Sequence, residues 1–347
     1  MRQATYTGKG TVLVRPADPV PPAAGQVRID VAYTGICGTD LHIFHGAMDG
    51  RVTPPTVLGH EMAGRIAEIG DGVTGWRAGE AVTVMPTVSC GDCPACSAGH
   101  AHVCHRLVFL GIDSDGAMQN SWTVPADLLV RLPESLRLDH AALVEPTAVA
   151  VHDVRRAELR PGEKAVVFGG GPIGVLIASV ARRAGAQVLM FEPNAQRRAI
   201  AQRLGLTCAD PHTGDVRALV EEWTDGVGAA VAFEVSGSAA GVTGAVDCLQ
   251  VHGRLVVVAI HPVAREVDLH RVFWRELTVL GARLYWRQDF EQAARLLAAG
   301  CVPVGLISRI EPLTRAEVAF AALDSDSGSG VMKVLIDCRR SEGNEPA

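Results

Sequence analysis

The chain has 347 residues, of which 48% are hydrophobic and 20% charged, a composition typical of a globular protein long enough for two domains. Its 32 basic and 38 acidic residues give a net charge of −6, which does not favour nucleic-acid binding. The sequence contains no run of 18 apolar residues and no N-terminal apolar core typical of a signal peptide, so we expect no membrane span and a cytoplasmic protein with reduced cysteines.

The first third of the sequence predicts a β-rich, barrel-like unit. Two β-rich stretches, 11–15 and 26–33, are separated by a proline-rich link. Further short strands are expected at 81–85 and 121–124, with glycines between the β-type segments.

The most specific local signal is a set of four cysteines within 15 residues, namely Cys90, Cys93, Cys96 and Cys104. Their C-x2-C-x2-C-x7-C spacing fits one tetrahedral Zn²⁺, and four thiolates leave no position for water or substrate, which indicates a structural zinc. The ferredoxin-like spacing leaves an iron–sulfur cluster or redox thiols as alternatives. Three nearby histidines are interpreted as surface residues of the same lobe rather than as competing ligands: His100, His102 and His105.

A glycine-rich turn follows a short apolar strand at 164–168. Gly169, Gly171 and Gly174 have the G-x-G-x-x-G spacing, and a helical pattern and a second strand ending at Glu192 come next. This order of strand, turn, helix, strand and acid predicts a dinucleotide site, whereas the glycines alone would be weak evidence.

Each part of this motif has a chemical reason. Gly169 permits the tight turn, Gly171 lets the backbone approach a pyrophosphate, and Gly174 lets the helix pack on the strand. Pro172 and Ile173 form the start of the helix, whose free N–H groups, none of them from Pro172, offer a partial positive charge to the phosphates. Glu192 would accept from a ribose 2′-hydroxyl and repel a 2′-phosphate, so we expect NAD rather than NADP. On the next helix, Arg197 is a candidate for contact with the adenosine. The alternative interpretation, and the default one, is that it lies on a solvated face of the helix.

Downstream of this motif the alternation of helices and strands continues. The expected segments are helices at 194–204, 238–249 and 290–299 and strands at 229–234, 253–260 and 277–284. Residues 308–313 and 330–337 are expected to complete the catalytic domain. Residues 258–260 should lie beside the nicotinamide, because ligands gather at the carboxyl ends of parallel strands.

The chain resembles the zinc-dependent medium-chain alcohol dehydrogenases, most closely the polyol branch of sorbitol and 2,3-butanediol dehydrogenases. The motifs that carry the resemblance appear in the family's order: Gly35–Asp40, Gly59–Glu61, the four-cysteine lobe, Glu145-Pro146 and the glycine-rich turn. It implies an α/β protein with a GroES-like β-rich catalytic domain and a Rossmann doubly wound parallel-sheet domain. The implied catalytic domain comprises residues 1–150 and 285–347, with the zinc lobe at 90–104, and the NAD domain comprises 151–284. A homodimer or homotetramer is also implied.

The resemblance assigns Cys37 and His60 as ligands of a catalytic zinc, and both are good zinc donors. The third donor is open. Glu145 stands where the alcohol-dehydrogenase branch has a cysteine, and Glu61 is the alternative oxygen ligand. Lys333 is implied only weakly, near the cofactor cleft.

A proton relay is also implied. Thr39 would take the proton from a zinc-bound alcohol, and His42 would pass it to solvent. Asp40 would hold His60 in orientation. His152, although close to Glu145 in sequence, is interpreted as a core residue.

The predicted function is the reversible oxidation of a secondary alcohol, a polyol or vicinal diol, to a ketone with hydride transfer to NAD. A threonine-type amino alcohol dehydrogenase, a zinc-free reductase and a non-catalytic NAD-binding redox sensor are the alternatives. The substrate itself is open. Six side chains are candidates for the pocket wall: Phe44, His45, Met48, Phe109, Trp122 and Trp274.

Overall fold

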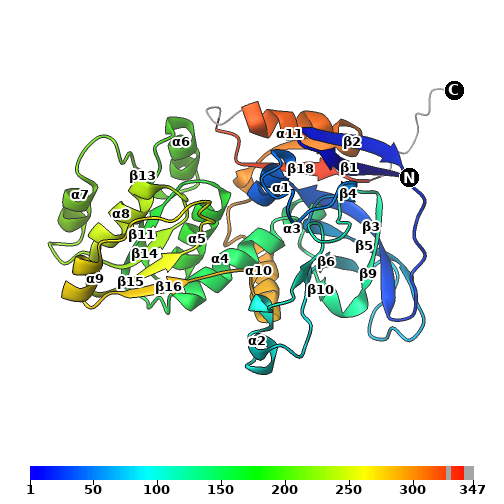
Figure 1. Ribbon diagram of the computed structural model, residues 1–347, viewed down its shortest axis with the longest axis horizontal. Helices are drawn as coiled ribbons and strands as arrows, with labels where there is room; N and C mark the ends of the chain where they lie inside the picture. The colour runs from blue at the N-terminus through cyan, green and yellow to red at the C-terminus, as the bar shows by residue number, and fades with distance from the viewer. Residues whose placement is uncertain (326–329, 340–347) are drawn as a thin grey trace.

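The computed structural model describes residues 1–325 and 330–339. It has two lobes, with the helices α4 (Val144–Arg156) and α10 (Arg287–Ala298) between them (Figure 1). The end of the expected 285–347 segment therefore lies outside the described residues. No helix in the described part is long and apolar enough to cross a membrane.

The first lobe is built from sheets whose strand pairs are antiparallel except for β17 and β18, which are parallel. A seven-stranded sheet has the order β10-β6-β5-β3-β18-β17, with β9 paired to β3, and two smaller sheets have the orders β2-β1-β4 and β7-β8. The C-terminal strand β18 lies antiparallel to β3, so the end of the chain returns to the first lobe. The strands are β1 (Arg2–Gly8), β2 (Thr11–Pro16), β3 (Gln26–Gly35), β4 (Thr56–Val57), β5 (Glu61–Ile69), β6 (Ala81–Val84), β7 (Thr87–Val88), β8 (Val108–Phe109), β9 (Ser121–Pro125), β10 (Leu129–Arg131), β17 (Ile307–Pro312) and β18 (Lys333–Asp337).

The second lobe has a six-stranded sheet in which every pair is parallel, in the order β13-β12-β11-β14-β15-β16. The order reverses beside β11, so the crevice at its carboxyl end is the switch point at which such sheets bind ligands. The strands are β11 (Lys164–Phe168), β12 (Gln187–Phe191), β13 (Thr207–Ala209), β14 (Ala229–Glu234), β15 (Leu249–Val257) and β16 (Thr278–Gly281).

The helices cover these sheets and connect them. The remaining α-helices are α1 (Gly38–Phe44), α2 (Pro94–Ser97), α3 (Leu138–Ala141), α5 (Pro172–Arg183), α6 (Ala195–Arg203), α7 (Val216–Trp223), α8 (Ala239–Asp247), α9 (Leu269–Trp274) and α11 (Ala316–Ser325). Four short 3₁₀ turns are η1 (Ala101–Val103), η2 (Ala126–Leu128), η3 (Val304–Leu306) and η4 (Leu313–Arg315). The expected Rossmann and GroES-like fold class is confirmed.

Several boundaries differ from the sequence expectations. The strand expected at 253–260 begins at Leu249 and ends at Val257, because Leu249 already pairs with Ala229 before the irregularity in the ladder. Helix α4 was not predicted, and it runs without a break across the expected domain boundary at 150/151. Pro146 masks the pattern, although proline is tolerated in the first turn, where its missing N–H costs no hydrogen bond.

An ionic cluster around the buried carboxylate of Asp289 joins α4 to α10. Arg155 donates from Nε and Nη2 to the two carboxylate oxygens of Asp289, each at 2.9 Å, and His152 Nδ1 lies 3.2 Å from the same carboxylate. The backbone N–H of Trp286 donates to it as well, at 2.8 Å. His152 is therefore a core residue, as the sequence indicated, and serves to bind the two helices together.

We expect Asp289→Asn to lower the melting temperature by about 5–10 °C at neutral pH, because it removes the buried negative charge that His152, Arg155 and the Trp286 N–H contact. Burial raises the pKa of Asp289, but the hydrogen bonds from His152, Arg155 and Trp286 outweigh it and lower the pKa to about 2. The stabilisation, about 2 kcal/mol, is therefore present above the unfolded-state pKa of about 4 and is lost as the pH falls towards 2.

Thermal melts of both proteins from pH 7 to pH 3 check this prediction. The difference in melting temperature should narrow at the acid end of the series. Glu291→Gln, an exposed position on the same helix, is the control and should leave the melting temperature unchanged. If the difference in melting temperature between the two proteins stayed constant from pH 7 to pH 3, the stabilisation would not come from the ionised Asp289 carboxylate.

Candidate active site

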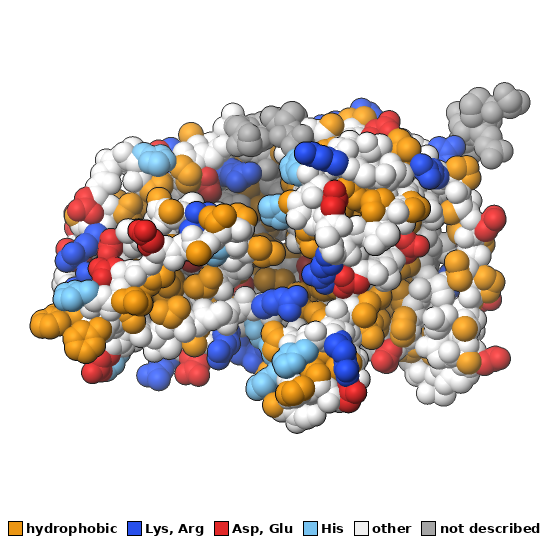
Figure 2. All heavy atoms as spheres, in the orientation of Figure 1, with side chains coloured by type: hydrophobic (Ala, Val, Ile, Leu, Met, Phe, Trp, Pro, Cys, Tyr) orange, Lys and Arg blue, Asp and Glu red, His pale blue; other side chains and the backbone are white. Residues whose placement is uncertain are grey.

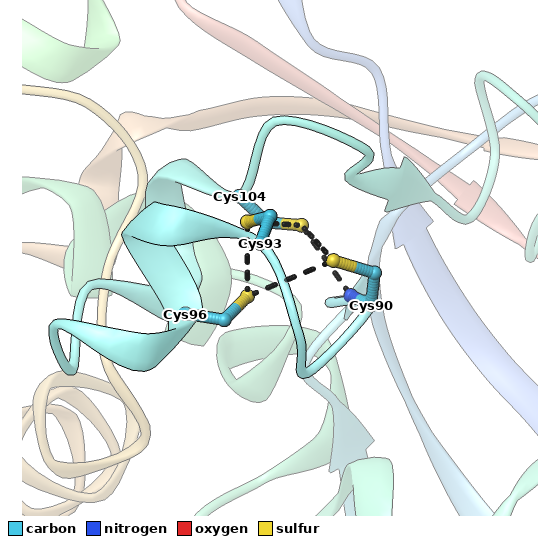
Figure 3. Close-up of side chains that lie close together, drawn as sticks. All are labelled: Cys90, Cys93, Cys96 and Cys104. Carbon is cyan, nitrogen blue, oxygen red and sulfur yellow. Dashed lines mark hydrogen bonds between the residues drawn. The ribbon is translucent and has the colours of Figure 1, made fainter.

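The four cysteines expected to bind zinc converge from α2, η1 and the loop before them (Figure 3). Their sulfur atoms are separated by 3.4 Å (Cys90 to Cys104), 3.5 Å (Cys93 to Cys96), 3.8 Å (Cys93 to Cys104) and 4.0 Å (Cys90 to Cys96). Four sulfurs about 2.3 Å from a central zinc would form a tetrahedron with edges of about 3.8 Å. The observed spacing therefore fits a closed zinc site.

Backbone N–H groups in this lobe point at the sulfur atoms. Those of Cys90 and Arg106 both donate to Cys104 Sγ at 3.3 Å. Backbone N–H groups, first that of Cys96 and then that of His105, lower the pKa of the Cys93 thiol to about 6. Burial raises the pKa of Cys96 to about 11, so the charge on the cluster depends on a cation to balance it.

One of the three nearby histidines has a different place from the expected one. His102 is half-buried and accepts from the indole N–H of Trp286, with its ring 5.1 Å from that of His152. It therefore docks the zinc lobe onto α4 and α10, whereas the sequence indicated a plain surface residue. None of the three histidines belongs to the four-sulfur group among the described residues.

A second group of potential metal ligands lies where the first lobe meets the second. Cys37 caps the N-terminus of α1, His60 directly precedes β5, and Glu61 is the first residue of that strand. One ligand atom from each of the three lies within 4.8 Å of the other two. Thiolate, imidazole and carboxylate are the donors that a catalytic zinc uses, and such sites keep a further position for water or substrate.

The orientation of this group depends on Asp40. Its Oδ2 accepts from the backbone N–H of Cys37 at 2.8 Å, while its Oδ1 lies 3.7 Å from Nδ1 of His60. Apart from this contact, Asp40 Oδ1 and His60 Nδ1 are buried without a hydrogen-bond partner among the described residues. Asp40 thus contacts both zinc-ligand candidates, the position proposed for it from the sequence.

The charges around this group also fit a bound cation. Burial acts against the charge on His60, yet Asp40, Cys37 and Glu145 outweigh burial and raise the His60 pKa to about 10. Burial also raises the pKa of Asp40, and it raises the pKa of Glu145 to about 7. An excess of buried acid that drives protons onto its members would be neutralised by a divalent ion, so these residues fit zinc.

The two candidate carboxylates have different neighbours. Both oxygens of Glu61 accept from Lys333 Nζ, at 2.7 and 2.8 Å, and a side chain at Gly35 would collide with Glu61, since a Cβ there would lie 2.1 Å from Oε2. Glu145 lies outside the three-residue group, and its neighbour is the buried Tyr285. Burial and then the charge of Glu145 raise the pKa of Tyr285, whose hydroxyl has no hydrogen-bond partner among the described residues.

The proposed proton-relay residues lie on α1. Thr39 is half-buried and His42 exposed, three residues apart and therefore on the same face of the helix. The order of exposure, with His42 more exposed than Thr39, is compatible with the proposed relay.

The glycine-rich turn has the predicted geometry. Gly169 has φ +111°, a conformation that favours glycine, and a Cβ on Gly174 would lie 1.9 Å from the Gly169 carbonyl oxygen. Nothing lies within 4 Å of a Cβ built on Gly171, which caps α5, so the backbone there is open to a ligand. Pro172 and Ile173 form the first turn of this helix, with its free N–H groups.

Glu192 follows the last residue of β12 and is buried. Its Oε2 accepts from the backbone N–H of Gly170 at 2.6 Å and its Oε1 from that of Asn194 at 2.8 Å, which ties the turn to the start of α6. Arg197 on that helix has its Nε buried without a hydrogen-bond partner among the described residues. The acid and the arginine thus stand at the same end of the sheet.

The sequence did not identify one residue near the ligand group, and it assigned two tryptophans to the pocket wall that lie elsewhere. Tyr285 lies beside Glu145, but no motif identifies it, because its chain segment is distant in sequence. Phe109, one of the expected pocket residues, packs its ring on His60 with centroids 5.1 Å apart. Trp122 is part of the first lobe's core, and Trp274 is a 73% exposed residue on α9 in the second lobe, so the expectation for these two tryptophans was wrong.

Two family models match the chain. One is described as an alcohol dehydrogenase GroES-like domain, over residues 23–134, and the other as a zinc-binding dehydrogenase, over 172–299. A 2-dehydro-3-deoxy-L-galactonate 5-dehydrogenase from Pseudoalteromonas atlantica is 47% identical over 343 residues, which cover 99% of this chain and 100% of that protein.

Solved structures agree with the family models. The 2R,3R-butanediol dehydrogenase from Bacillus subtilis is 31% identical, with a TM-score of 0.88 over 97% of this chain and 99% of that one. A zinc-binding dehydrogenase from Sinorhizobium meliloti, solved with NADP bound, is 31% identical, with a TM-score of 0.90 over 97% and 98% of the two chains. The similarity thus extends over nearly the whole fold.

Proposed function

The chain belongs to the zinc-dependent medium-chain alcohol dehydrogenases, enzymes that oxidise secondary alcohols, and we propose that Cys37, His60 and Glu61 hold its catalytic zinc. The observation that carries this proposal is the convergence of these three side chains in a buried, acid-rich pocket. We choose Glu61 over Glu145 because Glu61 alone shares the 4.8 Å group with the other two. Zinc held there would act as a Lewis acid that lowers the pKa of the substrate hydroxyl.

The protein's own side chains would handle the proton and the orientation of the substrate. Thr39 would accept the hydroxyl proton and His42 would release it to solvent, because the two share one face of α1. Lys333 would keep the Glu61 carboxylate in place through its two hydrogen bonds. Glu145 and the unpartnered hydroxyl of Tyr285 would face the substrate.

The open turn at Gly171 and the N-terminus of α5 would hold the pyrophosphate of a nicotinamide dinucleotide, which supplies the hydride acceptor. We assign NAD because the Glu192 carboxylate stands where a ribose 2′-hydroxyl would be read. Arg197 favours NADP instead, because an arginine at this place would attract the 2′-phosphate of that cofactor.

We expect kcat/KM with NAD to exceed that with NADP by at least about 100-fold, and Glu192→Gln to reduce this preference by about tenfold. The substitution removes the charge that repels the phosphate, and an amide oxygen still accepts from one backbone N–H. Initial rates with both cofactors check this. Equal use of NADP by the wild-type protein would contradict the assignment and shift the recognition to Arg197.

The names of two relatives indicate a general class of substrate. Their names describe a dehydrogenase of a sugar acid and a dehydrogenase of a vicinal diol. We propose a polyhydroxylated substrate that is oxidised at a secondary alcohol.

Metal analysis of protein purified without chelator, together with NAD reduction on a panel of substrates, tests the proposal. The panel comprises sorbitol, galactitol, 2,3-butanediol, L-threonine and galactonate. Two zincs per chain and turnover of a polyhydroxylated compound are the expected results, and His42→Ala should slow turnover most at neutral pH and least at high pH. Preference for threonine would support the amino-alcohol alternative, and one zinc with no turnover would refute the catalytic assignment.

We propose a homodimer formed through the edge of the second lobe. Strand β16 is the sheet's edge strand, and Val279 on it is 49% exposed. On the neighbouring α9, Phe273 and Trp274 are 75% and 73% exposed, and apolar side chains gather at this end of the molecule (Figure 2). Such an edge and patch are typical of an interface.

We expect the wild-type protein to have at least twice the mass of one chain in light scattering, and Val279→Asp to reduce it to a monomer. A charge at the centre of a paired edge would be buried without a partner. Val227→Asp, at an exposed site away from β16, serves as the control. A monomeric wild-type protein would contradict the proposed interface.

We also place the protein in the cytoplasm, where a reducing environment keeps zinc-binding thiols free. Cell fractionation tests this placement.

A further inference from the structure

The carboxylate of Glu234 lies at the end of β14, next to the switch point of the parallel sheet. Glu234 is the last residue of that strand and is fully buried. In the sheet it pairs with Phe168 of β11 on one side and with Val257 of β15 on the other. Because the glycine-rich turn begins directly after Phe168, Glu234 stands between that turn and the segment that follows β15.

One oxygen of this carboxylate organises the turn after β14. Glu234 Oε1 accepts from the backbone N–H groups of Ser236 and Gly237, at 2.9 and 3.0 Å, and from the Ser236 hydroxyl. This turn lies against the nucleotide turn, because a Cβ on Gly169 would be 3.1 Å from the Ser236 nitrogen. It also lies against the segment after β15, because a Cβ on Gly237 would be 3.4 Å from the carbonyl oxygen of Ile260.

The other oxygen of the carboxylate contacts a histidine from the segment after β15. His261 Nε2 lies 2.9 Å from Glu234 Oε2, and Arg265 Nε donates to His261 Nδ1 at 3.4 Å. A guanidinium group can only donate, so Nδ1 is the accepting nitrogen and Nε2 carries the hydrogen that His261 donates to Glu234. Arg265 also donates from Nη2 to the carbonyl oxygen of Gly237, at 2.9 Å. The loop at 258–265 is therefore attached to the end of β14 and to the turn after it by two side chains.

Residues 258–260 connect the end of β15 to His261. The first two donate their backbone N–H groups to the Glu234 carbonyl oxygen, at 2.9 and 3.1 Å. Within residues 1–325 and 330–339, no group donates a hydrogen bond to the three carbonyl oxygens of 258–260, and the Ile260 side chain is 73% exposed. Free acceptors and an apolar side chain at the carboxyl end of a parallel strand suit a flat ring that carries an amide, such as nicotinamide.

We propose that His261 is a positioning residue for hydride transfer, which through Glu234 holds residues 258–260 where they contact the nicotinamide ring. The inference rests on the proposed function, since it assumes a nicotinamide dinucleotide bound at the glycine-rich turn. Arg265 supports the same arrangement from the other side of the imidazole. Both side chains act through the backbone of the segment rather than by touching the reacting atoms.

Loss of the His261 bond should affect one half of the cofactor. A hydrogen bond to a buried carboxylate is strong, and its removal leaves Glu234 Oε2 without its imidazole partner. The ring would then be held less firmly, and hydride transfer requires a fixed distance between donor and acceptor. The pyrophosphate and the adenosine ribose, which we assign to Gly171 and Glu192, should bind as before.

His261→Ala tests the proposal with two ligands that differ only at the nicotinamide end. NADH and ADP-ribose, which lacks the nicotinamide ring, are titrated into zinc-loaded protein in a calorimeter. The affinity for NADH should fall about 10- to 100-fold, and that for ADP-ribose should stay within about twofold of the wild-type value. With the best substrate deuterated at the oxidised carbon, the isotope effect on kcat should increase, because hydride transfer becomes slow relative to NADH release.

Three further variants make the result specific. His261→Gln keeps an N–H donor and should recover most of the lost NADH affinity. Arg265→Ala removes the second attachment while the buried carboxylate keeps its imidazole, and should lower NADH affinity about threefold with ADP-ribose unchanged, so the test does not depend on the stability of His261→Ala. Glu266→Ala shortens an exposed side chain of the same loop outside both attachments, and should leave both affinities unchanged.

The two ligands also separate this inference from the proposed function. Equal losses of NADH and ADP-ribose affinity in His261→Ala would indicate a general defect of the second lobe and overturn the inference. Unchanged NADH affinity together with an unchanged isotope effect would overturn it as well. If the wild-type protein bound neither ligand, the cofactor assignment in the proposed function would itself be refuted.

Discussion

Cys37→Ser should lower kcat with the best substrate by at least about 10³-fold while leaving NADH binding within about threefold of the wild-type value. Cys37 is the thiolate of the inner ligand group, and a serine hydroxyl is a far weaker zinc donor. The Lewis-acid contribution of the metal to lowering the barrier is several kcal/mol, which corresponds to this loss. The nucleotide turn is built from a different lobe, so cofactor binding should persist.

Steady-state kinetics, NADH fluorescence titration and metal analysis together check this result. The variant should hold one zinc per chain instead of two. Cys208→Ser, a half-buried cysteine on β13 outside both ligand groups, is the control and should keep both metals and full activity. Near-normal turnover by Cys37→Ser protein that has lost one zinc would refute the metal-assisted mechanism.

Cys104→Ser should remove the other zinc and lower the melting temperature by more than about 10 °C. Structural zinc sites contribute folding free energy directly, with apparent binding free energies of about 10–16 kcal/mol in small zinc domains. Cys104 is buried at the centre of hydrogen bonds from two backbone N–H groups. Loss of the ion leaves three crowded thiols with no cation to balance them.

The consequence should extend beyond the lobe itself. His102, in the turn just before Cys104, accepts from the indole of Trp286, and Trp286 begins α10. Limited proteolysis should therefore cut the variant first within 90–106, and thermal melts should show the lowered transition. Cys301→Ser, outside the four-sulfur group, is the control. A variant with two zincs and a wild-type melting temperature would rule out this lobe as a metal site.

Much of the fold could be predicted because its signals are local. The strands at 164–168, 187–191 and 229–234 have the predicted limits, since buried parallel strands have continuous apolar sequences that end at glycine or charged residues. Helix α4 was missed because an acid and a proline interrupt its first turn, and tertiary packing against α5 and α10 compensates for them.

The residues of the candidate site also differ in whether the sequence alone could show that they lie together. Closely spaced ligands, as in the cysteine lobe or the His60-Glu61 pair, are visible in the sequence because turn geometry alone brings them together. Lys333 is 272 residues from Glu61, and Tyr285 is 140 residues from Glu145, so no spacing rule could pair them. Their proximity depends on β18 pairing with β3 and on the segment before α10 crossing the pocket.

The sequence by itself predicted the two-lobe class, the zinc lobe, the dinucleotide turn and two of the donors that we assign to the catalytic metal, Cys37 and His60. Only the tertiary structure indicates which carboxylate lies with those donors and which lysine bonds to it. The physical reason is the distance along the chain over which each kind of interaction acts. Turn, helix and strand preferences act within a few residues, whereas charge balance in a pocket is set by side chains that folding brings together from distant segments.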